Sequence, residues 1–196
     1  MKVSREQVAA NRRRILQAGS RLFRARGYDS VTVAEVMQAA GLTHGGFYGY
    51  FRSKDDLIAC ALADVLLGGA ETEIDLASYA RQYLTPTHRD DLAGGCPMAG
   101  LGAETVRQTP AARAAMTAGL RRQIDRLTSG APGRVGLERR RAAIAGYSAM
   151  VGALILARMS DDTELSEEIL AATRDSIAGK NQASPKPVRR RRKSTS

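Results

Sequence analysis

Apolar residues recur at helical spacing along most of the chain, and the alternating pattern of a half-buried strand is not recognisable. Within residues 4–26, Val8, Ile15 and Leu22 recur every seven residues and share one helical face. Gly27 follows at the position where a glycine commonly ends a helix. These patterns predict a long first helix and, repeated along the chain, an all-α fold.

Further helix starts follow within a short distance. Thr32 with Glu35 three residues later has the pattern of a capping box, which predicts a helix over 33–40. After a glycine-containing turn, Thr43 is expected to cap a second short helix over 43–51. Two short helices joined by such a turn and preceded by a longer helix are typical of a helix-turn-helix unit.

The rest of the chain divides into a helical body and a basic tail. A fourth helix is expected to begin after Ser53. Between glycine or proline breaks, further helical stretches are predicted over residues 72–84, 97–108, 110–128, 137–159 and 164–178. From residue 179 onward no core-forming pattern remains, and we expect disorder there. The predicted division is a head at 1–53, a body at 54–178 and a tail at 179–196.

Charge is concentrated at the two ends of this chain of net formal charge +10. Residues 1–54 hold ten Lys or Arg and three Asp or Glu, and residues 180–196 hold seven Lys or Arg and no acid. Residues 55–179, by contrast, hold thirteen basic and seventeen acidic side chains. The ends are therefore expected to meet an anion. The tail is either an arm that contacts phosphates or a solvated segment without a defined contact.

The stretch GLTHGGFYGYF, residues 41–51, combines glycines with large aromatic rings. Phe47 and Phe51, four residues apart, are expected to face inward and hold the second short helix against the head. The outer face would then carry little side chain, which lets a helix N-terminus approach a phosphate backbone or base edges closely. Tyr48 and Tyr50 would add hydroxyl contacts to phosphates. The alternative is that glycines and tyrosines only fill a tight three-helix packing.

The segment TVAEVMQAAGLTHGGFYGYFRSKDDL, residues 32–57, resembles the DNA-binding motif of the TetR-type transcriptional regulators. It has a Thr-hydrophobic helix start, an Ala-Gly-hydrophobic turn, a Tyr-x-Tyr-Phe run and a Ser-Lys-Asp start to the next helix. The likeness covers roughly residues 8–62. Gly46 departs from the family pattern, which more often has Thr, Ser or Ala there. The candidate DNA-contacting residues are Thr32, Thr43, His44, Gly45, Gly46, Tyr48, Gly49, Tyr50 and Lys54.

The resemblance implies a homodimeric repressor that binds a palindromic double-stranded DNA operator and is released from it by a small-molecule effector. Only two cysteines, far apart in the sequence, indicate a reduced, cytoplasmic compartment. Family members usually dimerise through their last two long helices. Here the helix predicted over 137–159 is rich in small residues, which lets another helix approach closely. A four-helix bundle across the two-fold axis is expected, with candidate interface residues Ile144, Tyr147, Val151, Leu154, Ile155 and Ile169. The alternative is a monomer that uses both helices in its own core.

An effector pocket is expected among the middle helices of the body. Its candidate lining residues, each equally compatible with plain core, are Tyr79, Tyr83, Cys96, Met98, Leu101, Met116, Leu120 and Ile124. Cys96 precedes Pro97 near a predicted helix start, where the helix dipole favours the reactive thiolate. Some members of the resembled family sense electrophiles or oxidants through such a cysteine. The alternative is a small, unreactive cysteine at a helix start.

Enzymatic function is not indicated by any recognisable nucleophile–base pair or carboxylate cluster. His88, Asp90 and Asp91 form a weak metal-site pattern. The same residues are more typical of a solvated polar loop. Cys60 and Cys96 lack metal-ligand spacing. We therefore expect neither an enzyme nor a cofactor or metal.

Membrane insertion is not expected either, because the longest apolar run, residues 142–157, is shorter than the about 20 residues that span a bilayer. The remaining functional alternative is a non-specific or architectural DNA-binding protein without an effector. The basic ends of the chain are compatible with such a protein, but it would not bind a specific operator.

Overall fold

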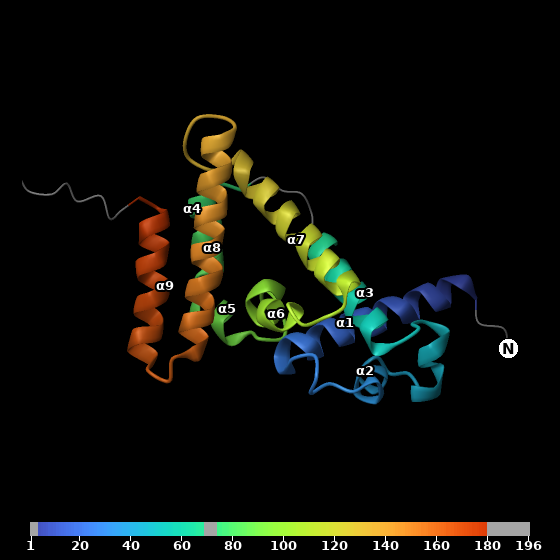
Figure 1. Cartoon of the computed structure of the whole chain (residues 1–196). Coiled ribbons are helices and arrows are strands. Elements are labelled where there is room, and N and C mark those ends of the chain that lie inside the picture. Colours follow the sequence, from blue (N-terminus) through green and yellow to red (C-terminus); the bar gives the residue numbers. More distant parts are fainter. Residues whose placement is uncertain (1–3, 69–73, 180–196) are drawn as a thin grey trace, which may run out of the picture.

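The computed structural model describes residues 4–68 and 74–179, and within these ranges all regular structure is helical (Figure 1). This confirms the predicted all-α fold. The predicted tail and the first residues of the helix expected over 72–84 lie outside the described ranges. In chain order the elements are α1 (Arg5–Arg26), α2 (Val33–Ala39), the 3-10 helix η1 (His44–Gly49), α3 (Lys54–Leu67), α4 (Leu76–Tyr83), α5 (Pro86–Asp90), α6 (Pro97–Thr105), α7 (Pro110–Ser129), α8 (Leu137–Met159) and α9 (Thr163–Ile177).

Local capping signals begin and end the helices of the head as the sequence predicts. The Thr32 side chain accepts a hydrogen bond from the Glu35 backbone N–H, and the Glu35 carboxylate accepts one from the Thr32 N–H, which is a complete capping box. The Ser53 side chain likewise accepts from the Asp56 N–H at the start of α3. Gly27 ends α1 with a φ of 80°, a conformation that favours glycine.

The second short helix differs from its prediction. It is a 3-10 helix rather than an α-helix, and the Thr43 side chain makes no capping hydrogen bond, although the Thr43 carbonyl accepts one from the Gly46 N–H at 3.1 Å. Glycines in its interior disfavour the α-helix by about 1 kcal/mol each, which is consistent with a short, tighter turn instead. Phe47 and Phe51 are buried, as predicted, and their rings stack 5.8 Å apart.

Two smaller expectations also need correction. Val8 is 39% exposed, because the first turns of α1 extend beyond the core of the head. No helix was predicted between residues 84 and 97, but the short helix α5 lies there, where the Thr85 side chain caps and Pro86 occupies the first turn. Proline is well tolerated at that position because its missing N–H is not needed there.

The described residues form two hydrophobic clusters. The head cluster joins α1, α2, η1 and α3 around Phe23, Val36, Phe47 and Leu57, and it also takes up Leu101 from α6. The body cluster is formed by α4 and α6 to α9, with Leu76, Leu84, Leu127, Met150 and Leu154 among its buried members. Helix α3 therefore shares the core of the head although it lies C-terminal to the predicted boundary at residue 53, and that boundary stays a prediction.

The helices are arranged so that α6 lies between the head and the body. In Figure 1, α8 and α9 stand side by side, α7 leans from the upper end of α8 toward α3 and α1, and α6 lies inside the angle that they form. Leu66 of α3 and Met116 of α7 pack against both clusters. Helix α8 is long and apolar enough to cross a membrane by length and composition, a test that the core helix of a globular protein also passes.

Candidate functional site

The outer face of η1 is nearly bare of side chains, and nothing inside the protein requires this. A Cβ atom added to Gly45 or Gly49 would meet no other atom within 4 Å, and one added to Gly46 would meet only Met37 and Thr43 atoms at 3.8 Å. Tyr48 is 75% exposed beside these glycines, with its ring edge-on to Phe47. Tight packing, the alternative reading of this stretch, therefore does not account for the glycines.

Tyr50 lies differently from its predicted place on the outer face. Its side chain is half-buried against the head cluster, and its hydroxyl accepts a hydrogen bond from the Asn11 side-chain amide at 3.0 Å. Asn11 is itself buried and accepts a bond from Gln7 at 3.0 Å. The main contact of the Tyr50 hydroxyl therefore joins the end of η1 to α1. Because the hydroxyl oxygen is the acceptor in this bond, its own proton remains free to donate another.

Thr32 and Lys54 lie at the two helix starts that flank η1 along the chain. Thr32 is exposed and donates from its hydroxyl to the Glu35 carboxylate at 2.8 Å. Bonds from the Thr32 backbone, from its hydroxyl and from Arg26 lower the pKa of the Glu35 carboxyl to about 2. Lys54 is half-buried in the first turn of α3. Thr43 and His44 are exposed at the start of η1. Which of these residues touch DNA stays a prediction.

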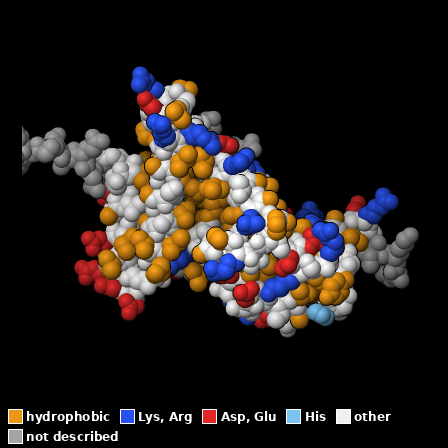
Figure 2. Space-filling view, in the orientation of Figure 1, with side chains coloured by type: hydrophobic (Ala, Val, Ile, Leu, Met, Phe, Trp, Pro, Cys, Tyr) orange, Lys and Arg blue, Asp and Glu red, His pale blue; other side chains and the backbone are white. Residues whose placement is uncertain are grey.

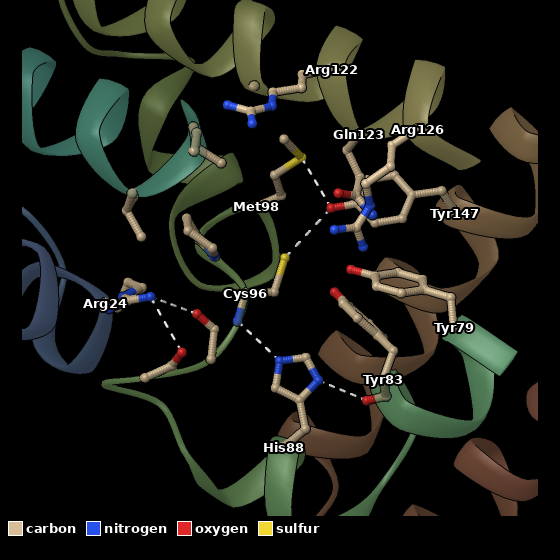
Figure 3. Close-up of a pocket in the computed structure, with 16 residues that line it drawn as sticks. Arg24, Tyr79, Tyr83, His88, Cys96, Met98, Arg122, Gln123, Arg126 and Tyr147 are labelled. Carbon is tan, nitrogen blue, oxygen red and sulfur yellow. Dashed lines mark hydrogen bonds between the residues drawn. The ribbon is translucent and has the colours of Figure 1, made fainter. Parts of the chain in front are cut away.

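An open cavity of about 340 Å³ lies between the head and the body, lined by residues of α3 to α8, of the loop before α6 and of the end of α1 (Figure 3). Four of the predicted pocket residues, Tyr79, Tyr83, Cys96 and Met98, line it. The full lining consists of Arg24, Val65, Leu66, Tyr79, Tyr83, His88, Gly94, Gly95, Cys96, Pro97, Met98, Gly119, Arg122, Gln123, Arg126 and Tyr147.

The other four predicted pocket residues lie elsewhere. Leu101 is buried in the head cluster, and Met116 packs between the two clusters. Leu120 is 39% exposed, and Ile124 is half-buried but does not line the cavity. The reason is that α7 turns a polar face toward the cavity, whereas the prediction placed its apolar residues there.

Sequence reasoning missed the polar side chains that α7 contributes. Gly119, Arg122, Gln123 and Arg126 line the cavity at the spacing i, i+3, i+4 and i+7, which is one helical face. That spacing was a readable signal, but a face with two arginines is more often a solvated surface. The close approach of α3 at Gly119, where an added Cβ would meet the Leu66 side chain at 2.6 Å, brings this face inside.

His88 and Cys96 are held in the cavity wall by backbone hydrogen bonds. The His88 Nδ1 atom lies 2.7 Å from the Tyr83 carbonyl oxygen, and its Nε2 atom accepts from the Cys96 N–H at 3.0 Å. Since a carbonyl only accepts, Nδ1 carries the proton and the ring is the neutral tautomer in this arrangement. His88 therefore positions Cys96 at the N-cap of α6, and neither His88 nitrogen is open for a metal.

No group of three or more His, Cys, Asp or Glu side chains placed to hold a metal ion occurs in the described ranges. The polar loop expected around His88, Asp90 and Asp91 is instead the helix α5, which contains His88 and Asp90 and has Asp91 as its C-cap. Asp91 accepts a hydrogen bond from the Gly94 N–H at 2.7 Å.

Three tyrosine hydroxyls point from α4 and α8 toward the space beside the Cys96 thiol (Figure 3). The Tyr147 hydroxyl lies 3.6 Å from the Cys96 sulfur and donates to the Met98 sulfur at 3.3 Å. Burial, with the nearby Cys96 as the second cause, raises the pKa of Tyr79 to about 12 and raises those of Tyr83 and Tyr147 as well. All three therefore stay neutral hydroxyls at physiological pH.

The cavity is connected directly to the head. Arg24, near the end of α1, donates from Nη1 to the carbonyl oxygens of Gly94 at 3.3 Å and Gly95 at 2.9 Å, in the loop that leads to Cys96. Burial is the main cause that lowers the pKa of its guanidinium. A second link runs from the Tyr28 hydroxyl to the Thr105 hydroxyl at 3.0 Å, at the other end of α6.

The predicted dimer residues divide between the interior and the surface. Tyr147 and Leu154 are buried in the body cluster and are not available to a partner, because α8 turns this face toward α4 and α6. Ile144 is 40% exposed, whereas Val151, Ile155 and Ile169 are half-buried. Figure 2 shows hydrophobic side chains gathered over the lower parts of α8 and α9. The additional large exposed hydrophobic residues of these two helices are Leu137, Leu156, Met159 and Leu165.

Comparison with known proteins finds the likeness mainly in the head. Residues 15–60 match the family model described as bacterial regulatory proteins, tetR family. The HTH-type transcriptional repressor Rv1474c of Mycobacterium tuberculosis is 38% identical over 92 residues, which are 47% of this chain and 46% of that protein. The HTH-type transcriptional repressor KstR2 of Mycolicibacterium smegmatis is 30% identical over 82 residues, 40% of each chain. The matches thus span less than half the length of these relatives.

Solved structures extend the likeness to the fold of the whole chain. The reduced form of NemR from E. coli superposes with a TM-score of 0.65 at 25% identity, covering 83% of this chain and 94% of that one. A TetR-family regulator from Agrobacterium tumefaciens superposes with a TM-score of 0.67 at 20% identity, covering 88% and 98%. At such low identity, the second likeness concerns the fold alone.

Proposed function

We propose that the chain, whose residues 15–60 match the tetR family of bacterial regulatory proteins, is a dimeric, sequence-specific DNA-binding repressor of that family that a small-molecule effector releases from DNA. The observation that carries this proposal is the outer face of η1, where Gly45 and Gly49 are bare without any packing reason. A helix start without side chains lets its backbone approach a phosphate or a base edge closely. Enzymatic activity forms no part of the proposal, and the place of action would be the cytoplasm.

DNA binding would use η1 in the major groove and the flanking helix starts on the phosphates. Exposed Tyr48 and the start of α3 at Lys54 lie on either side of the glycines in sequence. Residues 1–54 hold more basic than acidic side chains, which supports DNA binding by the head. Cations that neutralise phosphates release counterions from the DNA, and this release favours binding. Tyr50 would contribute mainly by holding η1 against α1.

Dimerisation would pair α8 and α9 with their symmetry mates in a four-helix bundle. The exposed Ile144, Leu156 and Leu165 on these helices support this, and small residues such as Ala145 and Ala149 are exposed beside them on α8. With Tyr147 and Leu154 inside the protomer, the bundle would use the exposed side of α8 that carries Ile144 and Leu156, and two of the expected interface residues would not take part. Two heads on a two-fold axis fit an operator of matching symmetry.

Release by an effector would act through the cavity. An effector there must bind the DNA-incompetent arrangement more tightly, and DNA then weakens effector binding by the same factor. Arg24 supports a mechanical link, because it joins α1 of the head to the Gly94 and Gly95 carbonyls in the cavity wall. Helix α3, which packs against both α1 and α7, is the second element that would carry the movement.

The first experiment is a fluorescence-anisotropy titration of the full chain against the DNA upstream of its own gene. A random duplex of the same length is the competitor, and both titrations are repeated at several salt concentrations. We expect a preference for the upstream DNA of about 10³-fold or more. Equal, steeply salt-dependent binding of both duplexes would instead support the architectural alternative, once duplexes from further upstream give the same result.

A single substitution tests the bare face directly. Gly45→Ala adds one methyl group where the protein has open space, so the fold should be unchanged or slightly more stable, because alanine favours a helix by up to about 1 kcal/mol over glycine. Affinity for the preferred duplex should nevertheless fall about tenfold, as expected for the loss of one good contact. Gly102→Ala, on α6 and equally open, is the matched control and should leave DNA affinity unchanged.

A second candidate function is a covalent response at Cys96. Its thiol lines the cavity at the N-cap of α6, and the similar structure of E. coli NemR is that of the reduced form. Toward an electrophile, the Cys96 sulfur would form a bond to one carbon of an activated C=C bond, and the thiol proton would end on the other. N-ethylmaleimide should then release DNA from the wild type and from Cys60→Ser but not from Cys96→Ser. Release from Cys96→Ser as well would exclude this site.

A further inference from the structure

Hydrogen-bond donors without a partner gather in one part of the cavity wall. The Tyr83 hydroxyl, the Gln123 side-chain Nε2 and the Arg126 Nε are buried and have no hydrogen-bond partner among the described residues. A buried polar group without a partner destabilises a protein by about 1–3 kcal/mol. All three line the same cavity, so one bound molecule with acceptor atoms would satisfy them together.

Charge in the cavity has one sign. Arg24, Arg122 and Arg126 line it, and none of the described lining residues is an Asp or Glu. Arg24 and Arg122 also bond to backbone carbonyls, of Gly95 and Leu67 respectively. Arg126 instead places its guanidinium over the Tyr79 ring, with 5.1 Å from Cζ to the ring centroid. A half-buried guanidinium that lies over an aromatic face is well placed to receive an anion, since Arg binds carboxylates in a bidentate fork.

Aromatic and aliphatic side chains also line the cavity and are suited to a flat ring. Tyr79, Tyr83 and Tyr147 form one side, and Met98, Val65 and Leu66 lie among the other lining residues. The Tyr83 and Tyr147 rings stand edge to face, with centroids 6.3 Å apart. Aromatic groups favour such offset or edge-on contacts with a further ring. The volume of about 340 Å³ admits a molecule of one or two rings.

We propose that this cavity binds a small aromatic carboxylate, with the carboxylate accepting hydrogen bonds from Arg126, Gln123 and Tyr83 and the ring lying among the tyrosines. That such a ligand acts as the effector rests on the proposed function, whereas its binding to the protein does not. A cationic ligand would meet arginines without an acid among the described lining residues. A purely apolar ligand would leave the three donors unpaired.

The test is isothermal titration calorimetry of the full chain without DNA. The probes are benzoate, 2-naphthoate and biphenyl-4-carboxylate, each compared with its primary amide and its aminomethyl analogue. These sets keep the ring and change the charge from −1 to 0 and +1. At least one carboxylate should bind about tenfold or more tighter than its amide, because hydrogen bonds to a charged group exceed neutral ones by that much. The aminomethyl analogue should bind most weakly.

Two variants locate the site, and a third serves as the control. Arg126→Met keeps the long side chain but removes the charge, so the carboxylate should lose about tenfold in affinity while the amide changes little. Gln123→Glu adds a negative charge of the same shape and should also reduce carboxylate binding. Arg121→Met, an exposed position of the same helix outside the cavity, should bind like the wild type. Thermal unfolding curves of all variants show whether they are folded.

The proposal is overturned if none of the carboxylates binds at millimolar concentration, if amides bind as tightly, or if folded Arg126→Met keeps the full preference. Failure of the proposed function gives a different result. In that case the carboxylate binds as expected to the protein alone, and the anisotropy titration with DNA shows no operator preference or no release by the same compound.

Discussion

The head and the cavity differ in whether their buried polar groups have hydrogen-bond partners. In the head, Asn11 is paired with Tyr50 and Gln7, and the Tyr28 hydroxyl is paired with Thr105 of α6. Around the cavity, the Tyr83 hydroxyl and the Gln123 and Arg126 nitrogens have no partner among the described residues. These polar groups of the head are thus satisfied within the protein, whereas the three groups in the cavity wall can still bond to a ligand. Stability and ligand binding are therefore expected to respond to different substitutions.

The largest expected effect comes from removing a ring from the head. Phe47→Ala empties a fully buried site that holds η1 against Phe51 and the head cluster, and it should lower the free energy of unfolding by about 3–5 kcal/mol. Chemical denaturation measures the loss. If the two clusters can be separated, DNA binding should vanish while a carboxylate probe still binds. Loss of both together would show that head and cavity form one cooperative unit.

A second effect concerns alkaline pH. The pKa of Tyr79 is raised to about 12 by burial, against about 10 in an unfolded chain. Below pH 10 both states hold the proton, but between pH 10 and 12 only the folded state does, so stability falls as the pH rises, by on the order of 1 kcal/mol per pH unit. Denaturation measured from pH 8 to 11.5 should show this decline, and Tyr79→Phe should make it shallower. An unchanged slope in the variant would assign the alkaline decline to other groups.

The smallest effect is the sharpest test of the contrast between the two regions. Tyr28→Phe removes a buried hydroxyl that is paired and should cost about 0.5–1.5 kcal/mol. Tyr83→Phe removes a buried hydroxyl that has no partner among the described residues, and it should leave stability unchanged or raise it slightly. Thermal and chemical unfolding of the pair of variants compare them directly. Equal destabilisation by both would mean that the Tyr83 hydroxyl is satisfied, contrary to the geometry described above.

Much of the head is readable from the chain because its signals are local. The capping box at Thr32, the start of α3 at Ser53 and the inward pair Phe47 and Phe51 all depend on residues three or four positions apart. The same signals failed at Thr43, where glycine-rich backbone favours a 3-10 helix over the α-helix that the pattern predicts. The exposure of the glycines was predicted, but only the structure excludes a packing reason for them.

Most helix spans, the capping residues Thr32 and Ser53, the family motif and the uneven charge were determined by the sequence alone, because each is set by neighbours within a few positions. The tertiary structure alone decided which face each helix turns inward. Helix α8 buries Tyr147 and Leu154 in its own protomer, and α7 turns Gln123 and Arg126 rather than Leu120 toward the cavity. The cavity draws on residues from Arg24 to Tyr147, and a helical period fixes the angle between side chains of one helix but not the rotation of that helix against its neighbours.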